Sequence, residues 1–383
     1  MKIQTEKLEN LVIYTSCILL LISLMILGNI TAFQFKITYF LKQCMWIAIA
    51  APFFWIFYKK INLQKVRPLA FPFVILGLFL LAAVFVPGVG IESNYSKRWI
   101  DLIVLNLQAS TVARVILIFY LVHYFVKNED QVADSTPTRF IQNYFPVLVI
   151  TFAYILLIFI EPDLSTSAIL FLIFFVVLFL ANISIKTILI IGLIAVILLG
   201  SIFILGATYR KERLLSFIHF ISGKDISPEI EERFYQPRQA LIALSQGKYT
   251  GKGTIDDRAK LFYLPFAKTD YIFSVIGEEF GFFGAVTLII IYLTLIISCF
   301  TLALRNPSFF HSLLIMALSL NILFNLIVNI SVVTSLIPST GVSLPFISYG
   351  GSATIMDVIS IGIILNASKN GRKNFTKTRF QYA

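Results

Sequence analysis

The chain has 383 residues, of which 58% are hydrophobic and 13% are charged. Soluble globular domains carry about 25% charged residues, so this composition predicts a membrane protein with many spans. The formal net charge is +11, but the basic residues lie in short segments between apolar stretches. They are expected to act as topology signals and lipid contacts, not as a nucleic-acid surface. The three cysteines and three histidines show neither a disulfide framework nor the spacing of a transition-metal site.

Ten apolar stretches are close to or above the roughly 20 residues that a membrane-crossing helix needs. They predict an all-α polytopic fold in which residues 1–383 form a single membrane domain. The first stretch has no small-residue cleavage signal, so it is expected to be an uncleaved span. The predicted spans are 11–33, 38–58, 68–87, 103–126, 142–160, 164–183, 185–207, 271–303, 308–336 and 343–366.

The basic residues also predict the orientation. Lys59, Lys60, Lys65 and Arg67 follow the second span, and five further basic residues fill the tail from Lys369 onward without an acidic residue. With ten spans, both regions lie on the same side as the N-terminus, and the positive-inside rule makes that side cytoplasmic. The segments 88–102, 161–163, 208–270 and 337–342 then face outward. The largest of them, 208–270, joins the seventh and eighth spans.

The segment 260–284 places acidic residues at the mouth of a membrane helix. An acidic residue at a helix centre costs roughly 2.5–3.5 kcal/mol, so such residues usually face a polar cavity or a partner. At roughly 100° per residue, Asp270 shares one helix face with Ser274, Gly277, Gly281 and Gly284. Close helix packing explains the glycines but leaves the aspartate unexplained. We therefore expect Asp270 to carry the chemistry.

Two glutamates follow Asp270 on the same predicted helix. Glu278 lies about 80° from the Asp270 line and is expected to border a cavity or to have a structural partner. Glu279 lies about 180° away, so on a straight helix it cannot share the site. We expect Glu279 to make a structural ion pair or hydrogen bond with another span.

The first outward segment contains the pair Arg98-Trp99. A tryptophan beside basic residues is typical of an interface anchor. The functional alternative is that Arg98 holds a phosphate while Trp99 shapes a sugar or lipid pocket. Arg114, inside the next predicted span, is costly in lipid and is expected to face the protein interior.

Two further outward segments have weaker patterns. In Glu161-Pro162-Asp163, proline breaks the helix and Asp163 can cap the next one, which is a sufficient structural role. In the large loop, Arg238 and Gln239 precede a short amphipathic helix predicted at 240–246. The Gly/Lys-rich run 247–253 then offers backbone N–H groups and charge to a phosphate, although it lacks the Walker A spacing.

The segment 338–352, PSTGVSLPFISYGGS, is rich in proline, glycine and serine at the start of a predicted span. Irregular backbone at membrane depth is tolerated only where it is buried in protein or lines a wet cavity. This segment is therefore the predicted second wall of the site.

Five of these segments, KRWIDL, EPDLSTS, YQPRQALIALSQGKYTGKG, LPFAKTDYIFSVIGEEFGFFG and IPSTGVSLPFISYGGS, occur in the order typical of one family. The chain resembles the SEDS family (shape, elongation, division and sporulation), which includes FtsW and RodA. Glu161 before Pro-Asp resembles the FtsW branch, because RodA more often has glutamine there. The resemblance implies polymerisation of lipid II, an undecaprenyl-pyrophosphate-linked sugar, into glycan strands outside the bacterial cytoplasmic membrane.

The resemblance also implies roles for particular residues. The family's essential aspartate falls on Asp270, and its Arg-Trp motif falls on Arg98 and Trp99. The chain departs from the family pattern at Ala109 and Thr111 of QAST, at Phe266 and Lys268 of PFAKTD, and at Thr340. Such departures are typical of a drifted sequence or of one with an altered cation or phosphate clamp, and they are not expected to remove activity.

The expected reaction is an inverting glycosyl transfer in which Asp270 removes a proton from the acceptor hydroxyl. Cations then stabilise the leaving pyrophosphate. A divalent ion, Mg²⁺ or Mn²⁺, is expected to bridge carboxylate and pyrophosphate, with Asp270 as its ligand, and no organic cofactor is expected. The expected substrate-binding residues are Arg98, Trp99, Arg238, Gln239, Lys252, Lys260, Lys268, Ser348, Tyr349 and Gly350, with Glu278 lining the cavity.

Three alternatives remain at this point. A RodA-like protein would act in elongation instead of division. A lipid II flippase or other transporter would place ionisable groups near mid-membrane and often show inverted repeats. A non-catalytic scaffold would dock cell-wall enzymes. The partner implied by the resemblance is a class B penicillin-binding transpeptidase, together with other cell-wall or division proteins.

Overall fold

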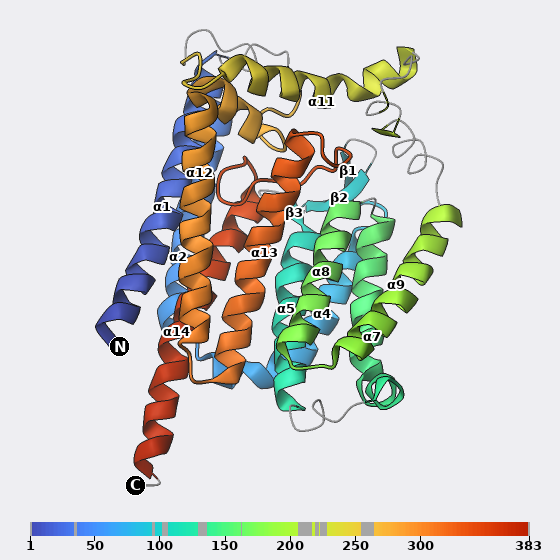
Figure 1. Ribbon diagram of the computed structural model, residues 1–383, viewed down its shortest axis with the longest axis vertical. Helices are drawn as coiled ribbons and strands as arrows, with labels where there is room; N and C mark the ends of the chain where they lie inside the picture. Colours follow the sequence, from blue (N-terminus) through green and yellow to red (C-terminus); the bar gives the residue numbers. More distant parts are fainter. Residues whose placement is uncertain are drawn as a thin grey trace.

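A computed structural model describes residues 2–33, 37–93, 96–101, 106–128, 136–161, 163–205, 217–218, 222, 228–253 and 264–381. Long helices run side by side in a bundle, and one helix, α11 (Pro228–Gly247), lies across one end of it (Figure 1). Both chain termini lie at the opposite end (Figure 1). This arrangement agrees with the prediction that the termini share one side and that the large loop faces the other.

Ten apolar helices make up the described part of the bundle. Among the described residues, eight candidate spans are long and apolar enough to cross a membrane, including Thr38–Lys60 and Leu63–Ala83, which extend beyond α2 and α4. The helices α8 and α9 contribute the shorter apolar stretches Leu164–Leu180 and Ile185–Leu198. The prediction of a polytopic helical membrane protein is confirmed. The helices are α1 (Lys2–Phe33), α2 (Thr38–Trp55), α4 (Ala70–Ala83), α5 (Ala109–Lys127), α7 (Pro137–Ile160), α8 (Leu164–Leu180), α9 (Ile185–Leu205), α12 (Ile272–Leu304), α13 (Phe309–Val333) and α14 (Gly351–Gln381). Three short elements, η1 (Ile56–Lys60), α3 (Leu63–Val66) and η2 (Arg67–Leu69), connect α2 to α4.

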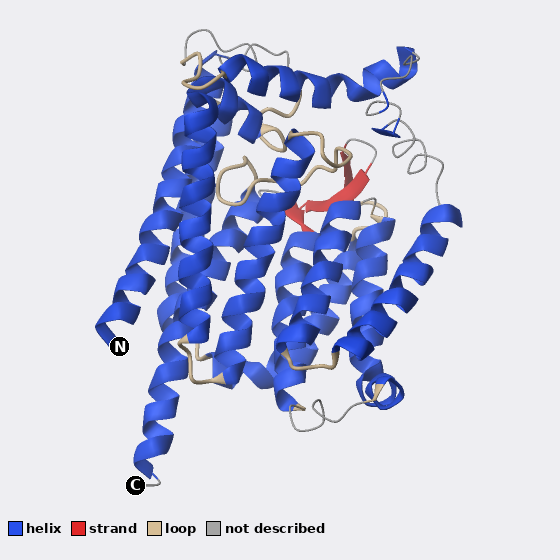
Figure 2. Cartoon of the chain, in the orientation of Figure 1, coloured by secondary structure: helices blue, strands red, loops and turns tan. Residues whose placement is uncertain are grey.

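The helical bundle also carries one small sheet, which the sequence analysis did not predict. The first outward segment forms a three-stranded antiparallel sheet of β1 (Gly90–Ser93), β2 (Ser96–Asp101) and β3 (Asn106–Gln108), near the end of the bundle that carries α11 (Figure 2). The predicted span 103–126 therefore begins too early, because α5 starts only at Ala109. Hydropathy alone cannot separate a short apolar strand from the helix that follows it.

The eighth span also differs from the straight helix that was expected. Asp270 lies in a turn before α12, and Gly281 interrupts the helix with φ 66° and ψ −164°. The predicted single face from Asp270 to Gly284 is therefore wrong. The interruption lets the loop at 247–253 dock backbone against backbone, since a Cβ on Gly281 would lie 2.3 Å from the Gly251 nitrogen.

The turn between α7 and α8 matches its predicted structural role. Asp163 caps α8 by accepting a hydrogen bond from the Thr166 backbone N–H at 3.2 Å. The carboxylate also accepts a bond from the Ser110 hydroxyl at 3.4 Å. Asp163 therefore ties the start of α8 to the start of α5.

Candidate active site

The Asp270 carboxylate and the Arg98 guanidinium approach one point beside Gly341. A Cβ placed on Gly341, whose φ is +72°, would lie 3.5 Å from Asp270 Oδ2 and 3.7 Å from Arg98 Nη1. Both charged side chains are only half-buried. Three segments that are distant in the sequence thus bring an acidic and a basic side chain together at the end of the bundle opposite the termini (Figure 1).

Asn329 of α13 holds two of these segments together. Its side-chain amide is buried and donates to the backbone oxygens of Asp270 at 2.8 Å and Val342 at 2.7 Å. Sequence reasoning missed this residue. The signal was present, because Asn321, Asn325 and Asn329 recur every four residues and so share one face of an apolar span. Such polar residues in a membrane helix usually face the bundle interior.

The irregular segment before α14 packs directly on the Asp270 turn. The Ser348 hydroxyl donates to the Thr269 carbonyl at 2.6 Å and accepts from the Leu344 backbone N–H at 2.8 Å. The Tyr349 backbone N–H donates to the Lys268 carbonyl at 2.9 Å. Ser348 and Tyr349 therefore hold the backbone of residues 268–269, directly before Asp270. Gly350 follows in the same segment, directly before α14.

Arg98 lies on β2 and is held from the α7–α8 turn. Its Nε donates to the Glu161 carbonyl oxygen at 3.3 Å. Trp99, beside it, is half-buried and pairs with Ile91 of β1 and Gln108 of β3. Arg98 itself has no partner in the ladder, because the register shifts between the pairs Ile91–Trp99 and Glu92–Lys97 and leaves Arg98 as the extra residue.

The Glu161 carboxyl group is fully buried, and neither of its oxygens has a hydrogen-bond partner among the described residues. Burial, together with the charge of Asp163, raises its pKa to about 9, against an opposing effect of Arg98. At neutral pH this carboxyl group is protonated.

Lys268 has an aromatic neighbour. Its Nζ lies 3.5 Å from the centre of the Tyr39 ring, and Tyr39 meets Tyr349 edge to face with ring centres 5.3 Å apart. A cation over an aromatic face is attracted by the ring quadrupole. The aromatic pair therefore restricts where this ammonium group can lie.

The Gly/Lys-rich loop at 247–253 follows α11 and packs against the backbone of α12. The backbone N–H groups of Lys252 and Gly253 donate to the carbonyls of Glu278 and Glu279 at 3.0 and 3.1 Å. The Lys252 ammonium lies 3.8 Å from Glu278 Oε1 and also bonds Gln246. These N–H groups already have acceptors, so the interpretation of the loop as a phosphate cradle is corrected. Lys252 keeps its side chain as a candidate cation.

The two glutamates of α12 have separate partners. Glu278 is fully buried and faces Lys252, whereas Glu279 accepts a 2.7 Å bond from the Asn29 side chain of α1. The structural partner predicted for Glu279 on another span is present. Glu278 belongs to the same junction as Lys252.

The remaining predicted binding residues are Arg238, Gln239 and Lys260. Arg238 is exposed and Gln239 half-buried on α11, which crosses the end of the bundle. Lys260 falls outside the described residues.

The described donor set does not by itself form a metal site. Among the residues that the structure describes, no three His, Cys, Asp or Glu side chains cluster closely enough to hold an ion. Mg²⁺ is usually held by one or two carboxylates together with substrate phosphates. The bridging divalent ion stays a prediction, and no step below depends on it.

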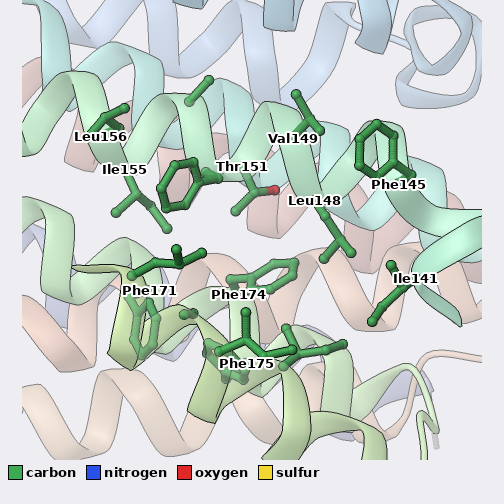
Figure 3. A pocket seen from close by; sticks show the side chains of 16 residues that line it. Ile141, Phe145, Leu148, Val149, Thr151, Ile155, Leu156, Phe171, Phe174 and Phe175 are labelled. Carbon is green, nitrogen blue, oxygen red and sulfur yellow. The ribbon is translucent and has the colours of Figure 1, made fainter. Parts of the chain in front are cut away.

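A separate apolar pocket of about 510 Å³ opens between α7, α8 and α9 (Figure 3). Phe145, Leu148, Phe171, Phe174 and Phe175 line it, and its lining contains no titratable side chain. The pocket has the chemistry of a hydrocarbon site and cannot act in acid–base catalysis.

Comparisons with known proteins agree with this geometry. The profile of the FtsW/RodA/SpoVE family, described as a cell cycle protein, matches residues 7–373. A probable peptidoglycan glycosyltransferase FtsW of Geobacter sp. (strain M18) is 33% identical over 304 residues, which cover 79% of each chain. Stage V sporulation protein E of Bacillus subtilis (strain 168) is 32% identical over 300 residues, 78% of each chain.

Solved structures show the same fold. A chain from the structure titled "Structural coordination of polymerization and crosslinking by a peptidoglycan synthase complex" superposes with a TM-score of 0.75 at 23% identity, covering 94% of this chain and 97% of that one. The rod shape determining protein RodA of Thermus thermophilus gives a TM-score of 0.68 at 22% identity, covering 94% and 96%. Because the family profile spans nearly the whole chain, this multi-pass protein of the bacterial cytoplasmic membrane belongs to the FtsW/RodA/SpoVE family.

Proposed function

We propose that this chain is a peptidoglycan glycosyltransferase that polymerises lipid II on the outer face of the cytoplasmic membrane. The observation that carries the proposal is the approach of Asp270 and Arg98 to one point beside Gly341. Glycosyl transfer from a pyrophosphate-linked donor requires a base for the acceptor hydroxyl and a cation for the leaving pyrophosphate, and Asp270 and Arg98 provide these two groups. Relatives named as probable peptidoglycan glycosyltransferases, among them FtsW of Geobacter sp. (strain M18), support the same activity.

In the proposed reaction, Asp270 removes the proton of an acceptor sugar hydroxyl as its oxygen attacks the anomeric carbon of the donor. The bond from that carbon to the pyrophosphate oxygen breaks, and the pyrophosphate leaves with the electron pair. The configuration at the anomeric carbon inverts, and the proton passes from Asp270 to solvent. A positioned base of this kind contributes roughly 10²–10⁴-fold.

The leaving pyrophosphate gains negative charge in the transition state. Arg98 is placed to stabilise it, because the guanidinium binds phosphate oxygens through two parallel N–H groups. Lys268, held over Tyr39, is the second candidate. Arg238, Lys252 and Lys260 remain candidates for holding the substrate at longer range. A divalent ion, if held by Asp270, would supply further positive charge for the leaving pyrophosphate.

The proposed biological setting is cell division with a class B penicillin-binding transpeptidase as partner. Relatives named FtsW favour division over an elongation role. The solved complex that coordinates polymerisation and crosslinking supports a crosslinking partner. Localisation of the tagged protein to the septum supports division, and localisation to the sidewall supports elongation.

The decisive experiment measures glycan-strand formation from purified lipid II by the chain alone and with the transpeptidase. We expect Asp270→Asn to lower the rate by roughly 10²–10⁴-fold, because the amide cannot accept the proton. The matched control is Glu6→Gln, which neutralises an exposed carboxylate on α1. Equal rates for Asp270→Asn and wild type would refute the base assignment. No polymerisation by wild type with any partner would favour a transporter or a scaffold.

A further inference from the structure

The segment 344–349 contains a residue in an unusual backbone conformation. Phe346 is 1% exposed and has φ +64°, a left-handed conformation that a bulky side chain rarely adopts and that its surroundings must enforce. Two residues later, the Ser348 hydroxyl donates to the Thr269 carbonyl, directly before Asp270. The direction in which the chain leaves Phe346 therefore affects where Asp270 lies.

The peptide group between Pro345 and Phe346, here called the 345–346 peptide, is hydrogen-bonded at both of its polar atoms. Its carbonyl oxygen accepts a bond from the Tyr292 hydroxyl, which is fully buried on α12. Its N–H donates to Asp357 Oδ2 on α14 at 2.9 Å. Two helices thus hold one peptide group, and neither side chain has a part in the proposed chemistry.

These two bonds oppose the rotation that would relieve the strain at Phe346. A peptide group is planar, so its C=O and N–H turn together as one unit. A rotation of the 345–346 peptide would change φ of Phe346 and would break both bonds at once. The Tyr292 hydroxyl would then lie buried without its acceptor, which costs free energy.

The next part of the segment has separate anchors. The Ile347 carbonyl accepts a bond from the Ser23 hydroxyl of α1 at 2.7 Å, and Ser348 remains bonded to Thr269. Loss of the bonds to the 345–346 peptide should therefore shift the segment without releasing it from the bundle.

We propose that Tyr292 and Asp357 are positioning residues that together clamp the 345–346 peptide and so set the position of Asp270. This inference rests on the proposed glycosyl transfer, in which Asp270 must reach the acceptor hydroxyl. Because the two bonds hold one rigid unit, the loss of either bond frees the same rotation. The effects of losing them should therefore not add.

Conservative variants test each bond. Tyr292→Phe removes a single oxygen and keeps the ring, so it tests the carbonyl bond even if a variant at Asp357 fails to fold. Asp357→Leu removes the acceptor at similar side-chain size, whereas Asp357→Asn keeps an oxygen for the Phe346 N–H and removes the charge. The control is Tyr154→Phe, because the Tyr154 hydroxyl is also fully buried and donates to the Val74 carbonyl of α4 at 2.7 Å.

The first measurement is the kinetics of lipid II polymerisation. We expect Tyr292→Phe and Asp357→Leu each to lower kcat by about 10-fold per folded molecule with KM changed less than about threefold, because a misplacement of about 1 Å can cost about 100-fold. The double variant should also lose about 10-fold, not the about 100-fold of independent effects. Asp357→Asn should restore most of the rate. Tyr154→Phe should lower thermal stability and leave kcat per folded molecule unchanged.

A second measurement does not depend on activity. Hydrogen–deuterium exchange should become faster at the amides of 346–349 in Tyr292→Phe and in Asp357→Leu. It should stay at the wild-type rate in Tyr154→Phe, whose lost bond lies between α7 and α4.

Several results would overturn the inference. Wild-type kcat in Tyr292→Phe would do so, as would a loss of kcat with unchanged exchange at 346–349. A multiplied loss in the double variant would show two independent contacts instead of one clamp, and an equal loss in Asp357→Asn and Asp357→Leu would remove the role of the bond to Phe346. If wild type itself fails to polymerise lipid II, the proposed function fails, and the exchange data still decide whether the clamp holds the segment.

Discussion

Glu161 shows how one residue can serve the site through its backbone while its side chain stays neutral. Its carbonyl oxygen orients Arg98, and burial raises the pKa of its carboxyl group to about 9. A neutral carboxyl group does not compete with a phosphate for the guanidinium, as a carboxylate would. The protonated form therefore suits a site that must receive an anionic substrate.

The same raised pKa predicts a pH dependence of stability. Between the ordinary pKa of about 4.5 and the folded value of about 9, the folded state keeps a proton that the unfolded state loses. The free energy of unfolding should therefore fall as pH rises through this window, by at most about 1.4 kcal/mol per pH unit from this group. Glu161→Gln has no proton to lose, so its stability advantage over wild type should grow from pH 5 to pH 8.5.

Thermal unfolding of the purified protein in detergent at several pH values checks this expectation. Glu6→Gln is the control, because this carboxylate on α1 is exposed. A constant difference between Glu161→Gln and wild type across the pH range would show that Glu161 is ionised in the folded protein.

At the scale of elements, hydropathy predicted the helices well because a membrane span has a simple length and composition. It failed where backbone conformation and long-range packing determine the local structure. In the sequence, the strands between 90 and 108 resemble a loop followed by a membrane span. Gly281, where the helix breaks, resembles one more small residue on a helix face. Neither feature has a local signal, because each depends on a partner segment elsewhere in the chain.

The break in α12 gives a prediction with a matched control. Gly281→Ala should destabilise the protein by several kcal/mol, since it adds left-handed strain and a clash with the backbone of residues 249–251 at 2.3–2.7 Å. Gly253→Ala also puts a side chain at positive φ (+75°), but its Cβ would have no neighbour within 4 Å. It should cost only about 1–2 kcal/mol.

Chemical denaturation of both variants measures the two free energies. The larger loss expected for Gly281→Ala reports the backbone contact between the loop and α12 together with the strain at Gly281. Equal losses in the two variants would mean that the loop does not pack tightly at Gly281.

At the scale of the whole molecule, the sequence predicted on which side of the membrane each loop lies, but not which loops contact one another. Basic residues and span count placed Asp270, Arg98 and the segment 338–352 on one side. Their approach to a single point depends on Asn329, Ser348 and the β2 ladder, which are tertiary contacts. The predicted alignment of Asp270 with the glycines of α12 was wrong for the same reason.

The orientation of the bundle is itself testable, and the proposed function depends on it. Cys17, Cys44 and Cys299 are first replaced, and a single cysteine is then introduced at Tyr249 or at Pro307. Tyr249 is 72% exposed in the loop before α12, and Pro307 is exposed in the turn after α12, so a whole span separates them. The positive-inside rule places Tyr249 outside and Pro307 in the cytoplasm.

A membrane-impermeant maleimide should therefore label Tyr249→Cys in intact spheroplasts and should label Pro307→Cys only after permeabilisation. The opposite pattern would turn Asp270 and Arg98 toward the cytoplasm. In that orientation the site could not add sugars to a glycan strand outside the membrane, whatever its geometry. The labelling experiment thus tests whether Asp270 and Arg98 face the outer side of the membrane, where the glycan strand is built.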